Sequence, residues 1–109
     1  DQVVRNGVVS CLVPYATPGI PLREVIKKTL NEFIEREKFF PKLILLQNHG
    51  IITASSSAKE CLTSALMCEK SAEIFIGAKL LNNMTFISPE SVAELNADPN
   101  EKYRRDLLQ

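Results

Sequence analysis

The sequence predicts an α/β domain in which helices cover a layered sheet, and three observations lead to this prediction. Short apolar runs, typical of buried strands, occur at 7–15, 43–46 and 51–53. Amphipathic helical patterns follow the first run and the last. The two central runs are too close in sequence for a crossover, so we expect them to pair antiparallel or to form one bent strand, and we do not expect an all-parallel sheet.

Composition limits the classes of partner. The 109 residues are 45% hydrophobic and 24% charged, which is typical of one ordinary globular domain. Thirteen basic and thirteen acidic residues cancel, so no electrostatic footprint for nucleic acid or an anionic membrane is present. The apolar runs are too short to span a membrane, and the start does not resemble a signal peptide. These features predict a cytoplasmic protein with no nucleic-acid or membrane partner.

The cysteines agree with a reducing compartment. Cys11, Cys61 and Cys68 show no CxxC spacing, and their number is odd. We expect all three to be free thiols that pack as small apolar residues, and a non-reducing mass spectrum would reveal any intramolecular disulfide. Cysteine-dependent acyl transfer is not favoured, because two of them are spaced seven apart in a predicted helix and the third is in a strand.

The first predicted strand covers 7–15 and ends where Pro14 cannot donate to a ladder. Asn6-Gly7 predicts a turn between two β-prone valine pairs. The chain has no initiator methionine, and its first residues resemble the interior of a domain, so we expect it to be a piece of a longer protein. Pro18-Gly19 suits a tight turn before the first helix.

The first predicted helix begins at Pro21, where a missing N–H costs nothing, and has a single apolar stripe. It should end near Lys38, because Phe40 precedes a proline and is pushed toward extended geometry.

The second predicted helix runs from Ala58 to about Leu81, and Ser57 with Glu60 has the spacing of a capping box. The three serines at 55–57 have an alternative interpretation as a phosphate-binding turn. The apolar and small residues of this helix are expected on or near one face: Ala58, Cys61, Leu62, Ala65, Cys68, Ala72, Phe75, Ile76, Lys79 and Leu80.

After the second helix, Thr85–Ile87 predicts a short edge strand. Ser88 followed by Pro89 then starts a helical tail over 88–109, interrupted at 98–100.

The only histidine, His49, occupies the polar break between the two central strands. Two interpretations stay open: a core histidine held by backbone partners, or a metal ligand or proton shuttle oriented by Gln47 or Asn48. Gly50 permits the turn through positive φ. One histidine cannot form a zinc site, and no cysteine lies near it in sequence.

Three segments together resemble the C-terminal half of the class II aldolase and adducin head-domain family: Val13 to Gly19, Leu45 to Gly50, and the helical Glu69 to Ile74. That family includes zinc-dependent fuculose and rhamnulose phosphate aldolases and ribulose phosphate 4-epimerase. The resemblance extends from about Gly7 to Leu81. It implies a class II aldolase-like αβα fold that is incomplete in this chain.

The resemblance implies roles for the central turn. His49 corresponds to one of the family's three zinc-binding histidines, and Gln47, Asn48 and Gly50 to supporting residues. The other two histidines of the family form a His-x-His pair, which this chain lacks, and no catalytic residue is identifiable in it. Three explanations compete: part of an intact aldolase, which we favour, a half-domain completed by another chain, or a non-catalytic relative.

The implied function is zinc-dependent aldol cleavage, or epimerisation, of a small sugar phosphate such as a ketose 1-phosphate by the intact protein. The alternative is a structural or interaction domain like the adducin head, without the metal site. The resemblance also implies a homo-oligomer, a tetramer with active sites between subunits. We expect residues 1–109 to form a single domain with a core at about 7–81 and a helical tail at 88–109.

Overall fold

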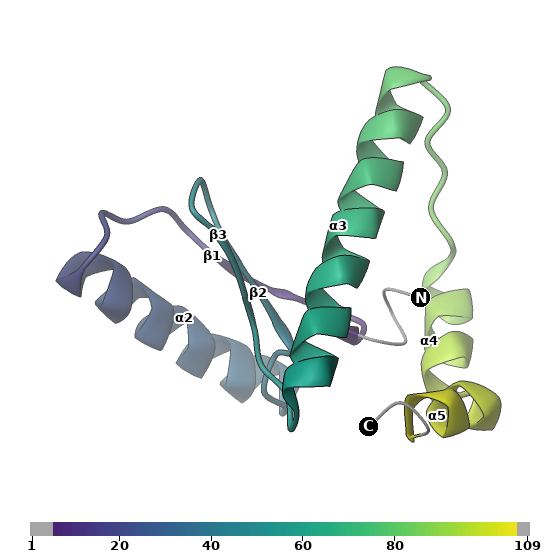
Figure 1. The fold of residues 1–109 in the computed structure, drawn as a ribbon, viewed down its shortest axis with the longest axis horizontal. Coiled ribbons are helices and arrows are strands. Elements are labelled where there is room, and N and C mark those ends of the chain that lie inside the picture. Colours follow the sequence, from purple (N-terminus) through teal and green to yellow (C-terminus); the bar gives the residue numbers. More distant parts are fainter. Residues whose placement is uncertain (1–5, 107–109) are drawn as a thin grey trace.

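The computed structural model of the protein describes residues 6–106, in which strands and helices follow the predicted order (Figure 1). The elements in chain order are β1 (Cys11–Val13), α2 (Ile20–Glu37), β2 (Leu43–Leu46), β3 (Gly50–Thr53), α3 (Ala58–Leu80), α4 (Pro89–Ala97) and α5 (Pro99–Asp106).

The sheet is mixed, with strand order β1-β2-β3. β1 pairs parallel with β2, so that Val13 lies opposite Leu46, and α2 forms the crossover between them. β2 pairs antiparallel with β3, with Leu46 opposite Gly50. The predicted antiparallel pairing of the central strands is therefore confirmed.

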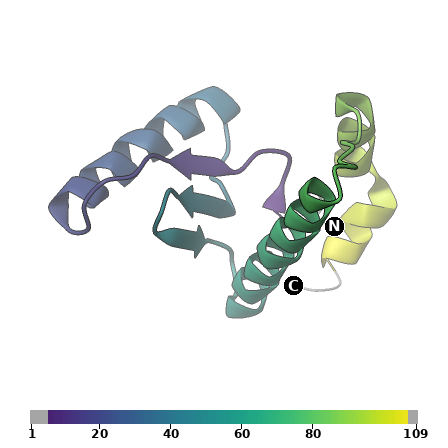
Figure 2. The same cartoon turned by 90° about the horizontal axis from the view of Figure 1, so that it is seen from above.

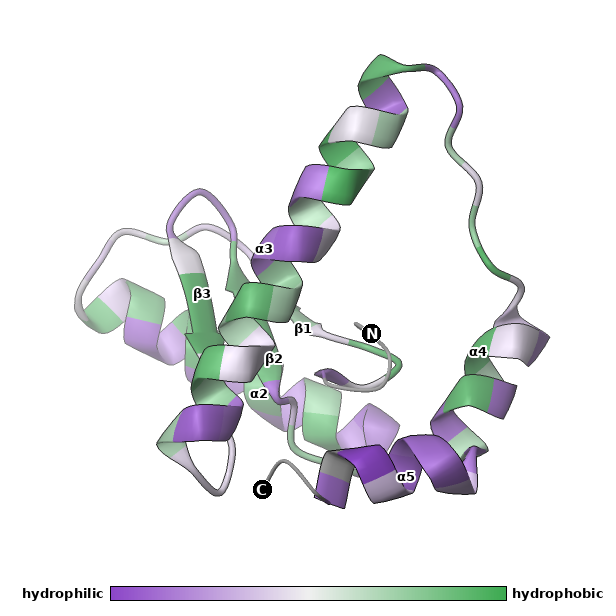
Figure 3. Cartoon of the chain, turned by 45° about the vertical axis from the view of Figure 1, so that its right-hand side comes forward, coloured by the Kyte–Doolittle hydropathy of each residue, from purple (hydrophilic) through white to green (hydrophobic). Residues whose placement is uncertain are grey.

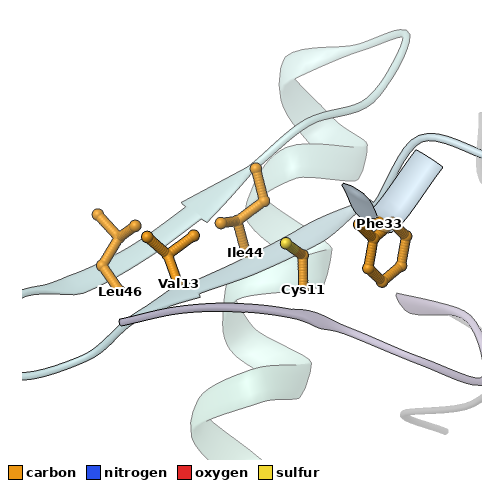
Figure 4. Close-up of a cluster of buried hydrophobic side chains, with 5 residues drawn as sticks. All are labelled: Cys11, Val13, Phe33, Ile44 and Leu46. Carbon is orange, nitrogen blue, oxygen red and sulfur yellow. The ribbon is translucent and has the colours of Figure 1, made fainter. Parts of the chain in front are cut away.

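The hydrophobic core lies between α2 and one face of β1 and β2 (Figure 4). Its buried members are Cys11, Val13, Phe33, Ile44 and Leu46. Phe33 is the aromatic centre of this core, and its ring meets that of Phe39 edge-on, with 5.5 Å between the ring centroids. The apolar stripe predicted for the first helix packs here, through half-buried Val25, Ile26 and Leu30.

Both ends of α2 are set by local chemistry. Pro21 occupies the first turn, where no intrahelical donor is needed. At the other end Lys38 takes a left-handed conformation, with φ 65°, and its N–H donates to the Ile34 carbonyl at 2.9 Å. The predicted helix is confirmed to within a residue of each end.

The start of α3 confirms half of the predicted capping box. The Ser57 hydroxyl accepts a hydrogen bond from the Glu60 N–H at 3.2 Å. The Glu60 carboxylate does not complete the box, because it accepts hydrogen bonds from the hydroxyls of Ser55 and Ser56 instead. All three serines of the cluster therefore form hydrogen bonds with Glu60.

α3 begins beside the carboxyl end of β3, contacts that strand and extends away from the sheet (Figure 2). Its most buried residue is Ser64, whose carbonyl accepts a hydrogen bond from the Asn6 side chain at 3.2 Å. The Cys61 thiol lies 3.9 Å from the Thr53 carbonyl. The predicted apolar face is only partly correct, because Leu62 and Leu80 are exposed at 61% and 81%.

Two strand predictions are wrong in the described part of the chain. β1 covers only Cys11–Val13, because β2 offers a partner to those three residues alone. Thr85–Ile87 is not a strand, since no described strand pairs with it, and Phe86 is 76% exposed. At the predicted Asn6-Gly7 turn, Gly7 has a φ of 87° and Asn6 is buried, and the valine pair before Asn6 lies outside the described residues.

In the segment predicted as a helical tail, the structure has α4 and α5 over 89–97 and 99–106, and the last three residues lie outside the described part. Ser88 caps α4 by accepting from the Ser91 N–H at 3.2 Å. The interruption is confirmed at Asp98, although α5 begins at Pro99, two residues earlier than predicted. No helix within residues 6–106 is long and apolar enough to cross a membrane.

Candidate metal-ligand turn

The β2–β3 turn presents the predicted site residues consecutively on the surface. The His49 N–H donates to the Leu46 carbonyl at 3.1 Å and closes the turn. Asn48, at φ 55°, takes the left-handed conformation that the third position of a type II turn requires. His49 is exposed. The structure therefore disfavours the interpretation of His49 as a buried core residue and leaves its imidazole accessible to a ligand.

Gln47 ties this turn to the loop after β1. Its N–H donates to the Val13 carbonyl at 3.0 Å, which continues the pairing of the two parallel strands. Its side-chain oxygen accepts from the Tyr15 N–H at 3.1 Å. The sequence pointed to Gln47 as an orienting partner of His49 but did not reveal its contact with Tyr15. The β1–β2 register, which no local pattern encodes, creates that contact.

The turn lies at the end of the sheet where ligands of α/β proteins usually bind. Both parallel strands end there, at Val13 and Leu46. The loop from Pro14 to Gly19 leaves the sheet at the same end and leads into α2 (Figure 1). Gly19, with φ 105°, caps that helix without a side-chain hydrogen bond. His49 and the amino end of α2 thus both follow the carboxyl ends of the parallel strands.

His49 suits a metal site as one donor among several. An exposed imidazole is a common ligand for zinc, but a catalytic zinc site needs about three protein ligands. Among residues 6–106, no group of three or more histidine, cysteine, aspartate or glutamate side chains could hold a metal ion. A complete site therefore requires donors beyond this part of the chain.

The cysteines take no part in the turn. Cys11 is buried in the core, and this burial raises the pKa of its thiol, an effect that the charge of Arg36 partly offsets. Cys61 and Cys68 are half-buried in α3, and all three thiols are free, as predicted. Since only the thiolate is a good metal ligand, Cys11 is also chemically unsuited to that role.

The serine cluster does not favour the alternative of a phosphate-binding turn. Glu60 places a negative charge beside the hydroxyls that would bind an anion. The hydrogen bond from Ser55 lowers the pKa of the Glu60 carboxyl, and burial partly offsets this by raising it. The hydrogen bond from Ser56 and the positive charge of Lys42 lower the pKa further. The carboxylate is therefore ionised at neutral pH, and the cluster acts as a helix cap.

This lowered pKa predicts an acid-dependent contribution to stability. A carboxyl whose pKa is lowered by folding stabilises the native state at every pH above its ordinary pKa of 4.5. This stabilisation is lost as the pH falls through the lowered pKa. We expect Glu60→Gln to reduce the free energy of unfolding at pH 7 and to have less effect at pH 3. Urea unfolding at both pH values measures this, with Glu94→Gln on α4 as control. An equal loss at both pH values would contradict the pKa argument.

Gly50 is required by the backbone of the turn. Its φ of 153° is one that other residues rarely adopt, although a Cβ there would meet no atom within 4 Å. We expect Gly50→Ala to lower the free energy of unfolding by about 1–3 kcal/mol through backbone strain alone. Gly77→Ala is the matched control, because Gly77 lies in α3 with equally open space and alanine should stabilise a helix by about 0.5–1 kcal/mol. Equal effects of the two substitutions in urea unfolding would refute the argument.

Comparison with known proteins gives one match. The family described as the class II aldolase and adducin N-terminal domain matches residues 2–76. No curated protein and no solved structure matches the chain significantly. The matched range contains the β1–α2–β2–β3 unit, the His49 turn and most of α3.

Proposed function

Because the chain belongs to the class II aldolase and adducin N-terminal domain family, we propose that the intact protein cleaves or epimerises a small sugar phosphate at a divalent-metal site. The mixed α/β architecture is compatible with an incomplete class II aldolase-like fold. Enzymes of this family are generally metal-dependent, bind sugar phosphates and form oligomers. The observation that carries the proposal is the exposed His49 at the carboxyl ends of the parallel strands.

In this proposal His49 is one of three imidazole ligands of a zinc ion, and the other two come from outside this chain. When bound, the metal supplies Lewis-acid stabilisation of the negative charge that develops on substrate oxygen atoms. Gln47 and Asn48 support His49 by holding the turn against the Tyr15 loop and by setting its backbone conformation. Gly50 supports it by allowing β3 to begin directly after the turn.

The proposal extends to organisation. We place residues 1–109 in a single domain with its core at about 7–81 and a helical tail at 88–109, within a homo-oligomer such as a tetramer. Three free cysteines favour a reducing compartment, for which the cytoplasm is our proposal.

The test uses the intact protein purified without chelator. Metal analysis should find zinc, and an assay with ketose 1-phosphates should detect cleavage or epimerisation that a chelator removes and added zinc restores. Full activity after verified metal removal would refute the metal-dependent mechanism. A protein without metal or activity would support the alternative of an adducin-head-like interaction domain.

A further inference from the structure

α3 carries a second apolar stripe on the side that faces away from Ser64, its most buried residue. The stripe follows the four-three spacing of a coiled-coil seam. We call it the α3 stripe, and its members are Leu62, Leu66, Glu69, Glu73, Ile76 and Leu80. The four apolar members are 50% to 81% exposed, and both glutamates are exposed. Figure 3 shows hydrophobic segments along α3, including the half beyond the sheet.

The chain exposes more surface than a self-contained monomer of its mass. Its accessible surface is 7821 Å², whereas a folded monomer of 12.2 kDa exposes about 6,100 Å². Its radius of gyration is 15.1 Å, against about 13 Å for a compact domain of this length. The excess, about 1,700 Å², is roughly twice the 800 Å² that one partner buries in an interface of standard size. The protruding α3 is a natural location for such an interface.

The charge pattern of the stripe argues against pairing with a second copy. The apolar pairs lie at the two ends of the stripe, and Glu69 and Glu73 occupy its centre. An antiparallel copy would place Glu69 opposite the Glu73 of its partner, and a parallel copy would place each glutamate opposite its twin. Both arrangements bring like charges together in a seam that excludes water.

We propose that the α3 stripe binds a helix of a different protein, with apolar residues at both ends of its own seam and lysine or arginine at the centre. The apolar ends would supply buried area, and the central ion pairs would set partner choice and register. The proposal concerns the outer side of α3 and does not depend on metal chemistry at the His49 turn.

Two synthetic three-heptad peptides provide the probe. They are identical, with leucine at the outer seam positions, except that one has lysine and the other glutamate at the two central positions. Fluorescence anisotropy with the purified protein should show at least about tenfold tighter binding of the lysine peptide. Equal binding of the two peptides, or binding of neither, would overturn the proposal.

Charge reversal of the protein sharpens the test. Glu69→Lys/Glu73→Lys should reverse the preference toward the glutamate peptide, and Glu69→Gln/Glu73→Gln should abolish it. Glu35→Lys/Glu94→Lys makes the same net-charge change on α2 and α4 and should leave the preference unchanged. Circular dichroism verifies folding of each variant. A wild-type homodimer in sedimentation that Leu66→Ser and Ile76→Ser disrupt would also overturn the proposal, because the occupant would then be a second copy.

Discussion

Replacing His49 with alanine is expected to lower the zinc affinity of the intact protein by more than about a hundredfold, because changes to residues that merely support metal ligands already cost 10- to 100-fold. Activity with ketose 1-phosphates should fall with metal occupancy. Stability should change little, since His49 is exposed and its backbone N–H, which donates to the Leu46 carbonyl, is kept in alanine. Metal analysis, the activity assay and urea unfolding measure the three quantities separately.

Asn83→Ala is a suitable control, because Asn83 is exposed in the segment after α3 and lies outside the proposed site. It should retain wild-type metal content and activity. If His49→Ala also retained both its metal content and its activity, the ligand role assigned to His49 would be wrong. If it lost both together with its fold, the turn would have a structural role that the exposed imidazole does not indicate.

Replacing Phe33 with alanine is expected to have the largest effect on stability, a loss of about 3–5 kcal/mol in the free energy of unfolding. Phe33 is 2% exposed and packs in the cluster between α2 and the sheet. The substitution also removes its edge-on contact with Phe39 and the position of the Arg36 guanidinium 5.6 Å from its ring centroid. A domain of this size is stabilised by about 5–15 kcal/mol in total, so the loss is a large fraction.

Phe86→Ala makes the same chemical change at a residue that is 76% exposed, and it should alter the free energy of unfolding by less than about 0.5 kcal/mol. Urea unfolding followed by circular dichroism compares the two. Similar losses for both variants would mean that the segment after α3 is buried in solution, contrary to the structure. A small loss for Phe33→Ala would mean that the α2 core contributes little.

Helix boundaries could be predicted from the sequence because their causes are local. Pro21 and the Ser88-Pro89 pair mark first turns through the geometry of proline, and Ser57 marks the start of α3 through a hydroxyl three residues before Glu60. The antiparallel central strands followed from a connection too short for a crossover. Each inference needed only a few neighbouring residues.

Strand limits could not be predicted in the same way, because a β-prone run becomes a strand only where another strand can pair with it. Thr85–Ile87 has suitable residues but no described partner, whereas Cys11–Val13 has β2. The same reason applies to the faces of α3. Local periodicity identifies apolar positions such as Leu62, but only the location of the sheet decides which of them become buried.

The contiguous residues of the candidate site could be predicted from the sequence, but its contacts with distant residues could not. The residues Asn48, His49 and Gly50 are contiguous, so their turn conformation follows from glycine and asparagine tolerance of positive φ. The contact of Gln47 with Tyr15 joins residues 32 positions apart and depends on strand register. In our proposal the remaining metal donors lie outside residues 1–109, so no pattern within these residues can indicate them.

The mixed sheet has a consequence for the order of folding. β2 and β3 are joined by a tight turn, whereas Cys11 and its partner Ile44 in the parallel pair are separated by the whole of α2. Closing the longer loop costs more chain entropy, and parallel pairing is intrinsically slow, whereas a hairpin forms within about 1–10 μs. We therefore expect the His49 turn to be among the first parts of the sheet to form. Its anchoring to Tyr15 through Gln47 would then be a late event that accompanies the docking of β1.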